Sequence, residues 1–567
     1  MAETVKVDIL ICGAGPVGLL LAYQLKRMGH SIYIIDRHDA EKQSMFGRAT
    51  SLFPRTLEML DQLDLLEEMN QIGVIGRSSV TFKDGKRLAS RGWHSMFTEM
   101  GETYLDYILN IRQKFSMDVF RRRYQKLGGL VGTEWTLKEM EIHEKDAEHY
   151  RVTSMLHGGS GGTKVVKSKY IIGADGGRST VRQLAGIDFN GEERTYRWVR
   201  IDGIFKTNMP DAEIGFNAIE SKKHGNVLWV QLEHGVQRIG FALNSEMYAK
   251  YGDTMTIEQA SAEAKEAMAP FTFEIERVEW WTLYKIQQKI AMHFVSGPVL
   301  LAGDSCHTHS SGAAQGMNTG MHDATNLGWK LGGVLGGWLK EEILKTYESE
   351  RRTAAQTLID LDEDFSTCLS GHVPERHAAM GADPNEVFFH LFQQSIQFNI
   401  GIGIEFAANI LNVDPHAGMV TAGKRGPDCL LRAPGSHIPT RLFQVTKNTG
   451  IFSVIVFAGQ PHLTASAVRS LRRVMDSKTT PLEMMPRGSF RLLTIIAGYA
   501  MNADTALGVE KFGDAYYDVD HTAHAKYHIS TSRGAIVILR PDGILGTAVD
   551  LDEPGIIAQY FSAFTRT

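Results

Sequence analysis

The chain has 567 residues and a mass of 63.0 kDa. It contains 60 lysines and arginines and 65 aspartates and glutamates, which gives a net charge of −5. With 43% hydrophobic and 22% charged residues, the composition is that of a globular protein of several domains. It excludes a disordered chain and a basic nucleic-acid-binding surface. The four cysteines have neither zinc-site nor disulfide-framework spacing, and we find no signal peptide and no membrane-spanning stretch. We therefore expect a soluble, cytoplasmic protein without a metal site.

The N-terminal segment carries the first recognisable pattern. Residues 5–12 (VKVDILIC) predict a buried strand, residues 19–29 predict a helix, and the apolar run SIYIID predicts a second strand that stops at Asp36. Between the first strand and the helix stands GAGPVG, with its glycines at Gly13, Gly15 and Gly18. Strand, glycine turn, helix, strand and acid are the context that a dinucleotide fingerprint requires.

Each part of this pattern has a physical role. Gly13 permits the tight turn, Gly15 lets the backbone approach a pyrophosphate, and Gly18 lets the helix pack on the sheet. The helix N-terminus offers free N–H groups to phosphate, and Asp36 accepts from ribose hydroxyls. This segment alone leaves the choice between NAD and FAD open, and the same glycines would serve as packing residues in another doubly wound fold.

Two later segments repeat the passage from a strand to a helix through a turn of small residues. KYIIGADGGRST, residues 169–180, carries Asp175 in its turn. In residues 298–329 a buried strand ends at Asp304, and a second helix is predicted to begin near Gly316. The N–H groups at the start of that helix would face the electron-rich edge of a flavin ring.

The order GAGPVG…DR, GADGGRS and GDSCHTHS…AQGMN…NLGWKL resembles the group A flavoprotein monooxygenases, and within them the phenol 2-monooxygenase branch. The resemblance implies an α/β fold in which residues 1–180 and 291–370 form a Rossmann-like FAD-binding domain. An antiparallel substrate-binding sheet is inserted at 181–290. A linker or helical segment at 371–422 leads to a thioredoxin-like C-terminal domain at 423–567. That last domain has no CxxC, so we expect structural support or a homodimer contact from it.

The resemblance also implies the chemistry. FAD is reduced by NADH or NADPH, which binds transiently because the chain has one nucleotide fingerprint only. Reaction with O2 then gives a C4a-hydroperoxyflavin that transfers one oxygen atom to a phenolic or other aromatic substrate. Two alternatives stay open: the same flavin chemistry used for oxidative decarboxylation or Baeyer–Villiger oxidation, and a non-catalytic flavin-binding protein.

By the same resemblance, the cofactor-binding residues are Gly13, Gly15, Gly18, Asp36, Arg37, Arg48, Arg112 or Gln113, Asp175, Asp304, Gly316, Met317 and Asn318. Tyr284 aligns with an active-site tyrosine of the phenol-hydroxylase branch, although a packing role in its strand is an equal alternative. The substrate-activating Asp of that branch is replaced here by Thr50, whose hydroxyl is no general base at neutral pH.

Other positions depart from the family pattern or allow two interpretations. Ser311 and Ala314 replace a Pro and a Gly in the loop before the second helix, which indicates a reshaped loop. His307 and His309 have no third metal ligand nearby in the sequence, so we expect a structural or flavin-neighbouring role. Arg238 either reaches the substrate pocket or faces solvent.

Overall fold

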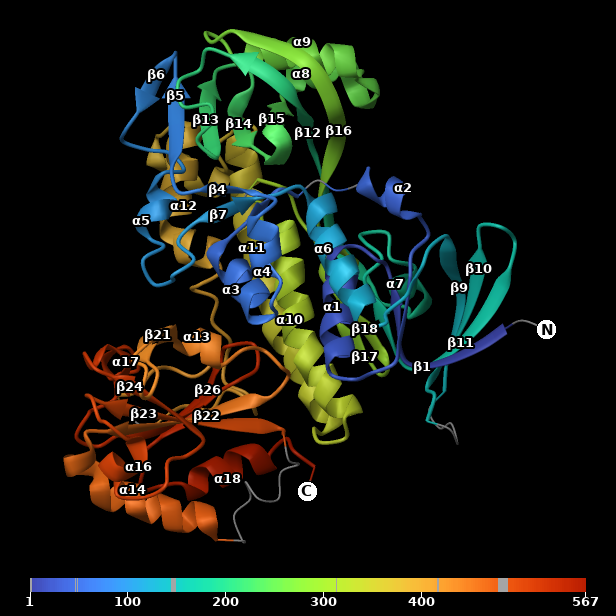
Figure 1. Ribbon diagram of the computed structural model, residues 1–567. Coiled ribbons are helices and arrows are strands. Elements are labelled where there is room, and N and C mark those ends of the chain that lie inside the picture. Colours follow the sequence, from blue (N-terminus) through green and yellow to red (C-terminus); the bar gives the residue numbers. More distant parts are fainter. Residues whose placement is uncertain are drawn as a thin grey trace.

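The computed structural model describes residues 3–45, 47, 49–143, 149–312, 314–415, 418–477 and 488–566. Arg48 lies outside these ranges. Figure 1 shows a central α/β body crossed by two long helices, a second sheet above it and a C-terminal α/β unit below it. The α/β class predicted from the sequence is confirmed.

The central body is built on an eight-stranded sheet with the main order β17-β18-β11-β1-β2-β8, to which β10 and β9 are added through β11. The strands β1, β2, β8, β11 and β18 run parallel, so their carboxyl ends lie at one edge of the sheet. Their bounds are β1 (Glu3–Cys12), β2 (Ile32–Ile35), β8 (Val131–Gly132), β9 (Trp135–Ile142), β10 (Val152–Gly158), β11 (Thr163–Gly173), β17 (Val295–Ser296) and β18 (Val299–Leu301).

The pairing register of the parallel strands places the three predicted turns next to one another. Cys12 pairs with Gly173, and Gly173 pairs with Leu301, so β1, β11 and β18 end side by side. Each of these strands is followed directly by one of the glycine-rich segments. The helices of this body are α1 (Pro16–Arg27), α2 (Ala40–Ser44), α3 (Pro54–Gln62), α4 (Leu66–Asn70), α6 (Gln113–Lys126), α7 (Thr180–Leu184), α10 (Gly316–Leu335) and α11 (Leu344–Leu369).

The second sheet also has eight strands, in the order β19-β16-β12-β15-β14-β13-β5-β6. Their bounds are β5 (Ser79–Lys83), β6 (Lys86–Leu88), β12 (Phe189–Thr207), β13 (Phe216–Ser221), β14 (Gly225–Gln231), β15 (Gln237–Leu243), β16 (Phe273–Ala291) and β19 (His307–Thr308). Its outer face carries α8 (Ser245–Tyr251) and α9 (Ile257–Ala267). A short sheet of β3 (Ser51–Leu52), β7 (Ile108–Asn110) and β4 (Val74–Gly76) lies between the two bodies.

This second sheet is more mixed than the sequence suggested. We expected an antiparallel sheet within residues 181–290, but β5 and β6 come from before that range and β19 from after it. β5 pairs with β13 in parallel, and the side chain of Asn217 accepts a hydrogen bond from the Val80 N–H at 3.0 Å. β5 has only five residues, and β13 is distant from it in the sequence. The sequence alone therefore gives no signal for this pairing.

Residues after α11 first form α12 (Pro384–Asn399), which packs against α5 (Ser95–Thr98) and the end of α11. The C-terminal unit follows, with a seven-stranded sheet in the order β21-β20-β24-β23-β22-β25-β26. Its bounds are β20 (Leu430–Arg432), β21 (Pro439–Arg441), β22 (Phe452–Gly459), β23 (Phe490–Ala497), β24 (Asp514–Asp518), β25 (Ala535–Leu539), β26 (Leu545–Val549), α13 (Leu442–Val445), α14 (Pro461–Asp476), α16 (Ala503–Leu507), α17 (Thr522–Lys526) and α18 (Gly555–Ser562).

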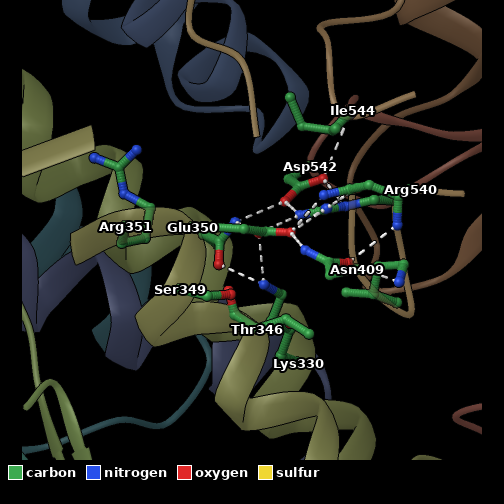
Figure 2. A network of polar contacts seen from close by, with 12 residues as sticks. Lys330, Thr346, Ser349, Glu350, Arg351, Asn409, Arg540, Asp542 and Ile544 are labelled. Atoms are coloured by element: carbon green, nitrogen blue, oxygen red, sulfur yellow. Dashed lines mark hydrogen bonds and ion pairs between the residues drawn. The ribbon is translucent and has the colours of Figure 1, made fainter. Parts of the chain in front are cut away.

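A buried polar network joins this C-terminal unit to the two long helices (Figure 2). Glu350 of α11 accepts from Arg540 at 2.7 and 2.9 Å and from Lys330 of α10 at 2.8 Å. Asp542, in the turn between β25 and β26, holds Arg540 at 2.7 Å and the Trp329 indole at 3.0 Å. The turn is thereby fixed to the helix that begins at the candidate site. Among the described residues, we find no helix with the length and apolarity to cross a membrane.

Candidate flavin and substrate site

A cavity of about 790 Å³ lies where the three strand ends meet the second sheet. Its wall includes residues of the first turn, the second turn and the third turn together. The predicted residues on this wall are Gly13, Gly15, Asp36, Arg37, Thr50, Gln113, Asp175, Tyr284, Asp304, Gly316 and Met317. Segments that are up to about three hundred residues apart in the chain thus share one cavity.

The three glycines of the first turn have two different roles: Gly13 and Gly18 allow close packing, and Gly15 leaves space for a ligand. A Cβ on Gly13 would stand 2.2 Å from the Ala174 carbonyl oxygen, and one on Gly18 would stand 2.0 Å from the Gly13 oxygen. Backbone atoms therefore leave no room for a side chain at Gly13 or at Gly18. Gly15 differs, because a Cβ there would meet no described atom within 4 Å. Gly15 leaves open space on the cavity wall, where a ligand phosphate can approach the backbone.

Two helices start at this cavity with free N-terminal N–H groups. α1 begins after Gly15 and α10 after Gln315, and neither has a side-chain cap. Both helices lie wholly in described ranges, and neither has an acidic residue in its first turn. The positive end of each helix dipole is thus left for negative charge from a ligand. A pyrophosphate and the electron-rich edge of a flavin both fit this requirement.

Asp36 closes the first turn at the end of β2. Its Oδ2 accepts from the Ala14 N–H and its Oδ1 from the His38 N–H, each at 2.9 Å. A carboxylate oxygen has more than one acceptor direction, so both atoms can still accept from a ribose hydroxyl. Asp36 and its neighbour Arg37 lie on the cavity wall.

Asp175 offers an unsatisfied acceptor in the second turn. Its Oδ2 accepts from the N–H groups of Thr180 at 2.7 Å and Val181 at 3.2 Å, at the start of α7. Its Oδ1 is buried and has no hydrogen-bond partner among the residues that the structure describes. Burial raises the pKa of this carboxyl group. A buried acceptor without a partner is costly, and a cofactor hydroxyl or its water would relieve that cost.

The third turn is held from behind by Asp323 of α10. Asp323 Oδ2 accepts from the Gly303 N–H at 3.0 Å and lies 2.7 Å from His307 Nε2, and Oδ1 accepts from Arg351 at 2.8 Å. Burial opposes ionisation of Asp323, but His307 and Arg351 outweigh it and lower its pKa to about 2. Asp304 of the same turn is exposed on the cavity wall.

Cys306, His307 and Asp323 lie close enough together to hold a metal ion. However, Asp323 is already paired with Arg351, and burial raises the pKa of the Cys306 thiol well above its ordinary value. The Cys306 thiol also donates to the Gly303 carbonyl, so the polar atoms of this cluster already have partners within the protein. The geometry therefore supports the structural interpretation of His307. His309 lies on the cavity wall, with its buried Nε2 unpaired among the described residues.

Some predicted residues support the cavity without lining it. Arg112 is held by Glu233 and by Glu279, the latter at 2.7 Å, whereas its neighbour Gln113 lies on the wall. Asn318 donates to the Ser51 carbonyl at 2.9 Å and accepts from the Phe53 N–H at 3.0 Å. It ties α10 to the strand β3 behind the cavity.

The half of the cavity under the second sheet is lined mainly by aromatic and apolar side chains, with Arg200, Asn226 and Arg238 among the polar exceptions. The lining residues there include Trp93, Trp198, Phe216, Leu228, Phe241, Ala242 and Leu369. Tyr284 of β16 and Ser311 form a hydrogen bond between their hydroxyl groups. Ser311 thus gains a polar partner where the family pattern has Pro. Ala314 adopts φ of 55°, a left-handed conformation that costs a non-glycine residue free energy.

Two arginines of this half were not assigned from the sequence: Arg238 was left with two alternatives, and Arg200 was missed. Arg238 is 2% exposed, lies on the wall and pairs with Asp202 at 2.6 Å, so it does not face solvent. Arg200, on the long strand β12, also lies on the wall. The alternating pattern of β12 places Arg200 on one face, but the sequence does not show which face is covered.

Comparison with known proteins identifies the family of this chain. The family model described as FAD binding domain matches residues 6–362. This chain belongs to the FAD-dependent aromatic monooxygenases. A second family model, described as the phenol hydroxylase C-terminal dimerisation domain, matches residues 404–567 of this monooxygenase.

Relatives of this monooxygenase align over almost the whole chain. A 3-hydroxybenzoate 4-monooxygenase of Comamonas testosteroni is 27% identical, over 99% of this chain and 95% of its own length. A phenol 2-monooxygenase, fsqG, of Aspergillus fumigatus is 26% identical, over 98% of this chain and 96% of its own length. The crystal structure of the flavin-dependent monooxygenase PieE, in complex with FAD and substrate, superposes with a TM-score of 0.75 at 18% identity, over 99% of this chain and 100% of the other.

Proposed function

We propose that this monooxygenase uses NAD(P)H and O2 to insert one oxygen atom into a phenolic ring held under the second sheet. The observation that carries the proposal is the continuity of one cavity from the glycine turn of β1 to the aromatic wall around Trp198 and Phe216. A dinucleotide bound along the three strand ends would therefore present its ring system to the substrate pocket.

FAD fits the residues present, and when bound it supplies the transfer of electrons from NAD(P)H to O2 and the transfer of oxygen to the ring. The N-terminus of α1 would bind its pyrophosphate at Gly15. Asp36, Asp175 and Asp304 would accept from its hydroxyl groups, and the N-terminus of α10 at Gly316 and Met317 would stabilise negative charge on the flavin ring.

The residues of the substrate half would orient the ring and exclude water. Tyr284 and Ser311 form a hydroxyl pair that can donate to, or accept from, a substrate hydroxyl. Thr50 lies on the wall but offers no base, so proton removal from the substrate must rest on other groups or on a substrate that is already acidic. The apolar wall keeps water from the reacting atoms.

Two other outcomes use the same cavity. Oxidative decarboxylation or Baeyer–Villiger oxidation needs the same cofactor and differs in the bond that receives oxygen. A non-catalytic flavoprotein would bind FAD without oxidising NAD(P)H in response to an aromatic compound. The aromatic pocket beside the cofactor segments favours the catalytic alternatives over the last one.

The C-terminal unit would be a thioredoxin-like domain that forms a homodimer contact. Its strands β22, β23 and β24 run parallel, and β25 and β26 add to the sheet in antiparallel orientation. Helices α14 and α16 make the connections between the parallel strands. The match to a dimerisation-domain family supports the homodimer.

The test is a screen of phenols, hydroxybenzoates and larger polycyclic aromatics for stimulated NADH or NADPH consumption, with O2 uptake and mass analysis of products. We expect a product that has gained one oxygen atom. Loss of carbon dioxide would instead identify oxidative decarboxylation. A yellow protein that no aromatic compound stimulates would contradict the proposal.

A further inference from the structure

We propose that Arg200 binds an oxyanion of the aromatic substrate, either a carboxylate or an ionised ring hydroxyl, so that the preferred substrates are acidic aromatics. This inference rests on the proposed function, because it concerns the substrate half of the same cavity. The inference adds the requirement that the substrate carry a negative charge. The shape of the pocket alone does not impose this requirement.

Arg200 is a buried cation on the cavity wall. The residue is 7% exposed. Its Nη1 donates to its neighbour's carbonyl, Val199 O, at 3.0 Å, and its Nη2 to Ser311 Oγ at 3.3 Å. The guanidinium also lies over the Trp198 ring, 4.9 Å from its centroid. These contacts use two of its five N–H donors on neutral acceptors.

Most buried arginines among the described residues hold a carboxylate, whereas Arg182 and Arg200 donate to neutral oxygens, and of these two only Arg200 lies on the cavity wall. Arg238, Arg351 and Arg540 each hold a buried carboxylate, at 2.6 Å, 2.8 Å and 2.7 Å. Within the part of the chain that the structure describes, Arg200 has no such ion pair. Asp202, on the same strand, acts on Arg200 through its charge and partly opposes the lowering of its pKa by burial, but the Asp202 carboxylate is hydrogen-bonded to Arg238. The Arg200 guanidinium therefore lies on the cavity wall beside Tyr284 without a carboxylate of its own among the described residues.

The backbone around Arg200 is arranged to give its side chain room. Arg200 of β12 pairs with Gly240 of β15, and a Cβ on Gly240 would stand 2.5 Å from Arg200 Cδ. The absence of a side chain at this register position leaves the space that the guanidinium fills. A larger residue at 240 would displace Arg200 from its place on the wall.

Electrostatics give the reason why an anion should bind here. Burial lowers the pKa of Arg200, which shows that its surroundings disfavour the charge. An arginine nevertheless stays protonated in proteins, so the charge persists and calls for a counter-charge. A planar oxyanion can accept from the free N–H groups of the guanidinium and gain a charge-assisted hydrogen bond.

The neighbouring groups define the ligand further. Tyr284 and Ser311 offer hydroxyl groups next to Arg200, and the wall of this half is otherwise mainly aromatic and apolar, with Asn226 and the carboxylate-paired Arg238 as polar residues. The ligand that satisfies all of them is a flat aromatic ring with one oxyanion and a polar group at its edge. A neutral hydrocarbon ring would leave Arg200 buried and unpaired.

The test measures ligand binding to the FAD-loaded enzyme by isothermal titration calorimetry, without turnover. Benzoate is compared with neutral benzamide, and 4-nitrophenol at pH 8 is compared with phenol, so that the two pairs separate carboxylate from phenolate. We expect the anion of at least one pair to bind tenfold or more tightly than its neutral partner. Arg200→Met should remove this preference, and Arg200→Lys should keep part of it.

Arg197→Met is the matched control, because Arg197 lies on the same strand and is paired with the exposed Asp253 at 2.6 Å. It should leave the anion preference unchanged. Equal binding of anion and neutral partner in both pairs, or an anion preference that survives Arg200→Met, would overturn the inference. If instead anions bind through Arg200 but no aromatic compound stimulates NAD(P)H oxidation, the proposed function fails and the anion site stands.

Thermal unfolding separates this role from a packing role. Arg200→Met replaces an unpaired buried charge with an apolar side chain of similar length, so the ligand-free variant should unfold at the same or a higher temperature than the wild type. A lower unfolding temperature with unchanged ligand binding would mark Arg200 as a packing residue.

Discussion

The backbone of Gly13 lies against the carbonyl of Ala174 so closely that a Cβ on Gly13 would stand 2.2 Å from that oxygen. Gly13 also has φ of 106°, a conformation that L-residues rarely adopt. This contact joins the turn after β1 to the turn after β11. The convergence of two cofactor segments thus depends on the absence of a single methyl group.

The first prediction separates folding from cofactor binding within one turn. Gly13→Ala should destabilise the protein by several kcal/mol and prevent FAD binding, because backbone closes that position. Gly15→Ala should leave the apo unfolding temperature close to the wild-type value, since its Cβ meets no described atom within 4 Å. It should nevertheless weaken FAD binding about tenfold or more. Thermal unfolding and FAD titration of both variants check this, and equal effects of the two substitutions would contradict it.

The second prediction concerns the hydroxyl pair of the substrate half. Tyr284→Phe and Ser311→Ala each remove one member of the pair without removing its apolar bulk. We expect either variant to bind FAD normally but to slow product formation about tenfold and to release more H2O2 per NAD(P)H. The ratio of product to NAD(P)H consumed is the measurement. Unchanged coupling in both variants would reduce Tyr284 to a packing residue.

The third prediction follows from Asp323. Its folded pKa of about 2 lies below the ordinary value of 3.8. Asp323 therefore contributes stability that is complete above about pH 4 and is lost as the pH falls from 4 through 2. The shift corresponds to about 2 kcal/mol. Denaturant unfolding across this range should show a steeper acid loss in wild type than in Asp323→Asn, and parallel curves would contradict the assignment.

The fourth prediction concerns the network of Figure 2. Glu350→Gln removes the charge that neutralises both Arg540 and Lys330, and all three side chains are buried. Because two cations would then be left without that partner, we expect a loss of about 3–5 kcal/mol in the free energy of unfolding. Asp360→Asn, an exposed acid on the same helix, is the control and should cost less than about 0.5 kcal/mol. A small effect of Glu350→Gln would show that the network is dispensable.

The sequence predicted the features that depend on local pattern. The strand ends, the glycine turns and the start of α10 at Gly316 all have local signals, and the structure places them as expected. Parallel pairing then brings the turns together without further information. This is why one N-terminal motif and two later segments were enough to predict that the three turns lie on one cavity.

The substrate half was less predictable because it depends on distant pairing. The position of β5 beside β13 and the pairing of Arg112 with Glu233 join residues more than a hundred positions apart. Arg200 and Arg197 lie in the same strand, and only the tertiary structure shows that Arg197 is paired with Asp253 while Arg200 has no ion pair among the described residues. We therefore expect the specificity of this enzyme to depend on the tertiary pairing of the second sheet.

The most direct test of the account is an equilibrium titration of the purified, flavin-free protein with FAD, followed by flavin fluorescence. We expect one FAD per chain, and weaker binding in Gly15→Ala, Asp175→Ala and Asp304→Ala, one variant from each of the three turns. A protein that binds no FAD, or variants that bind it as tightly as the wild type, would contradict the claim that the three turns form one site.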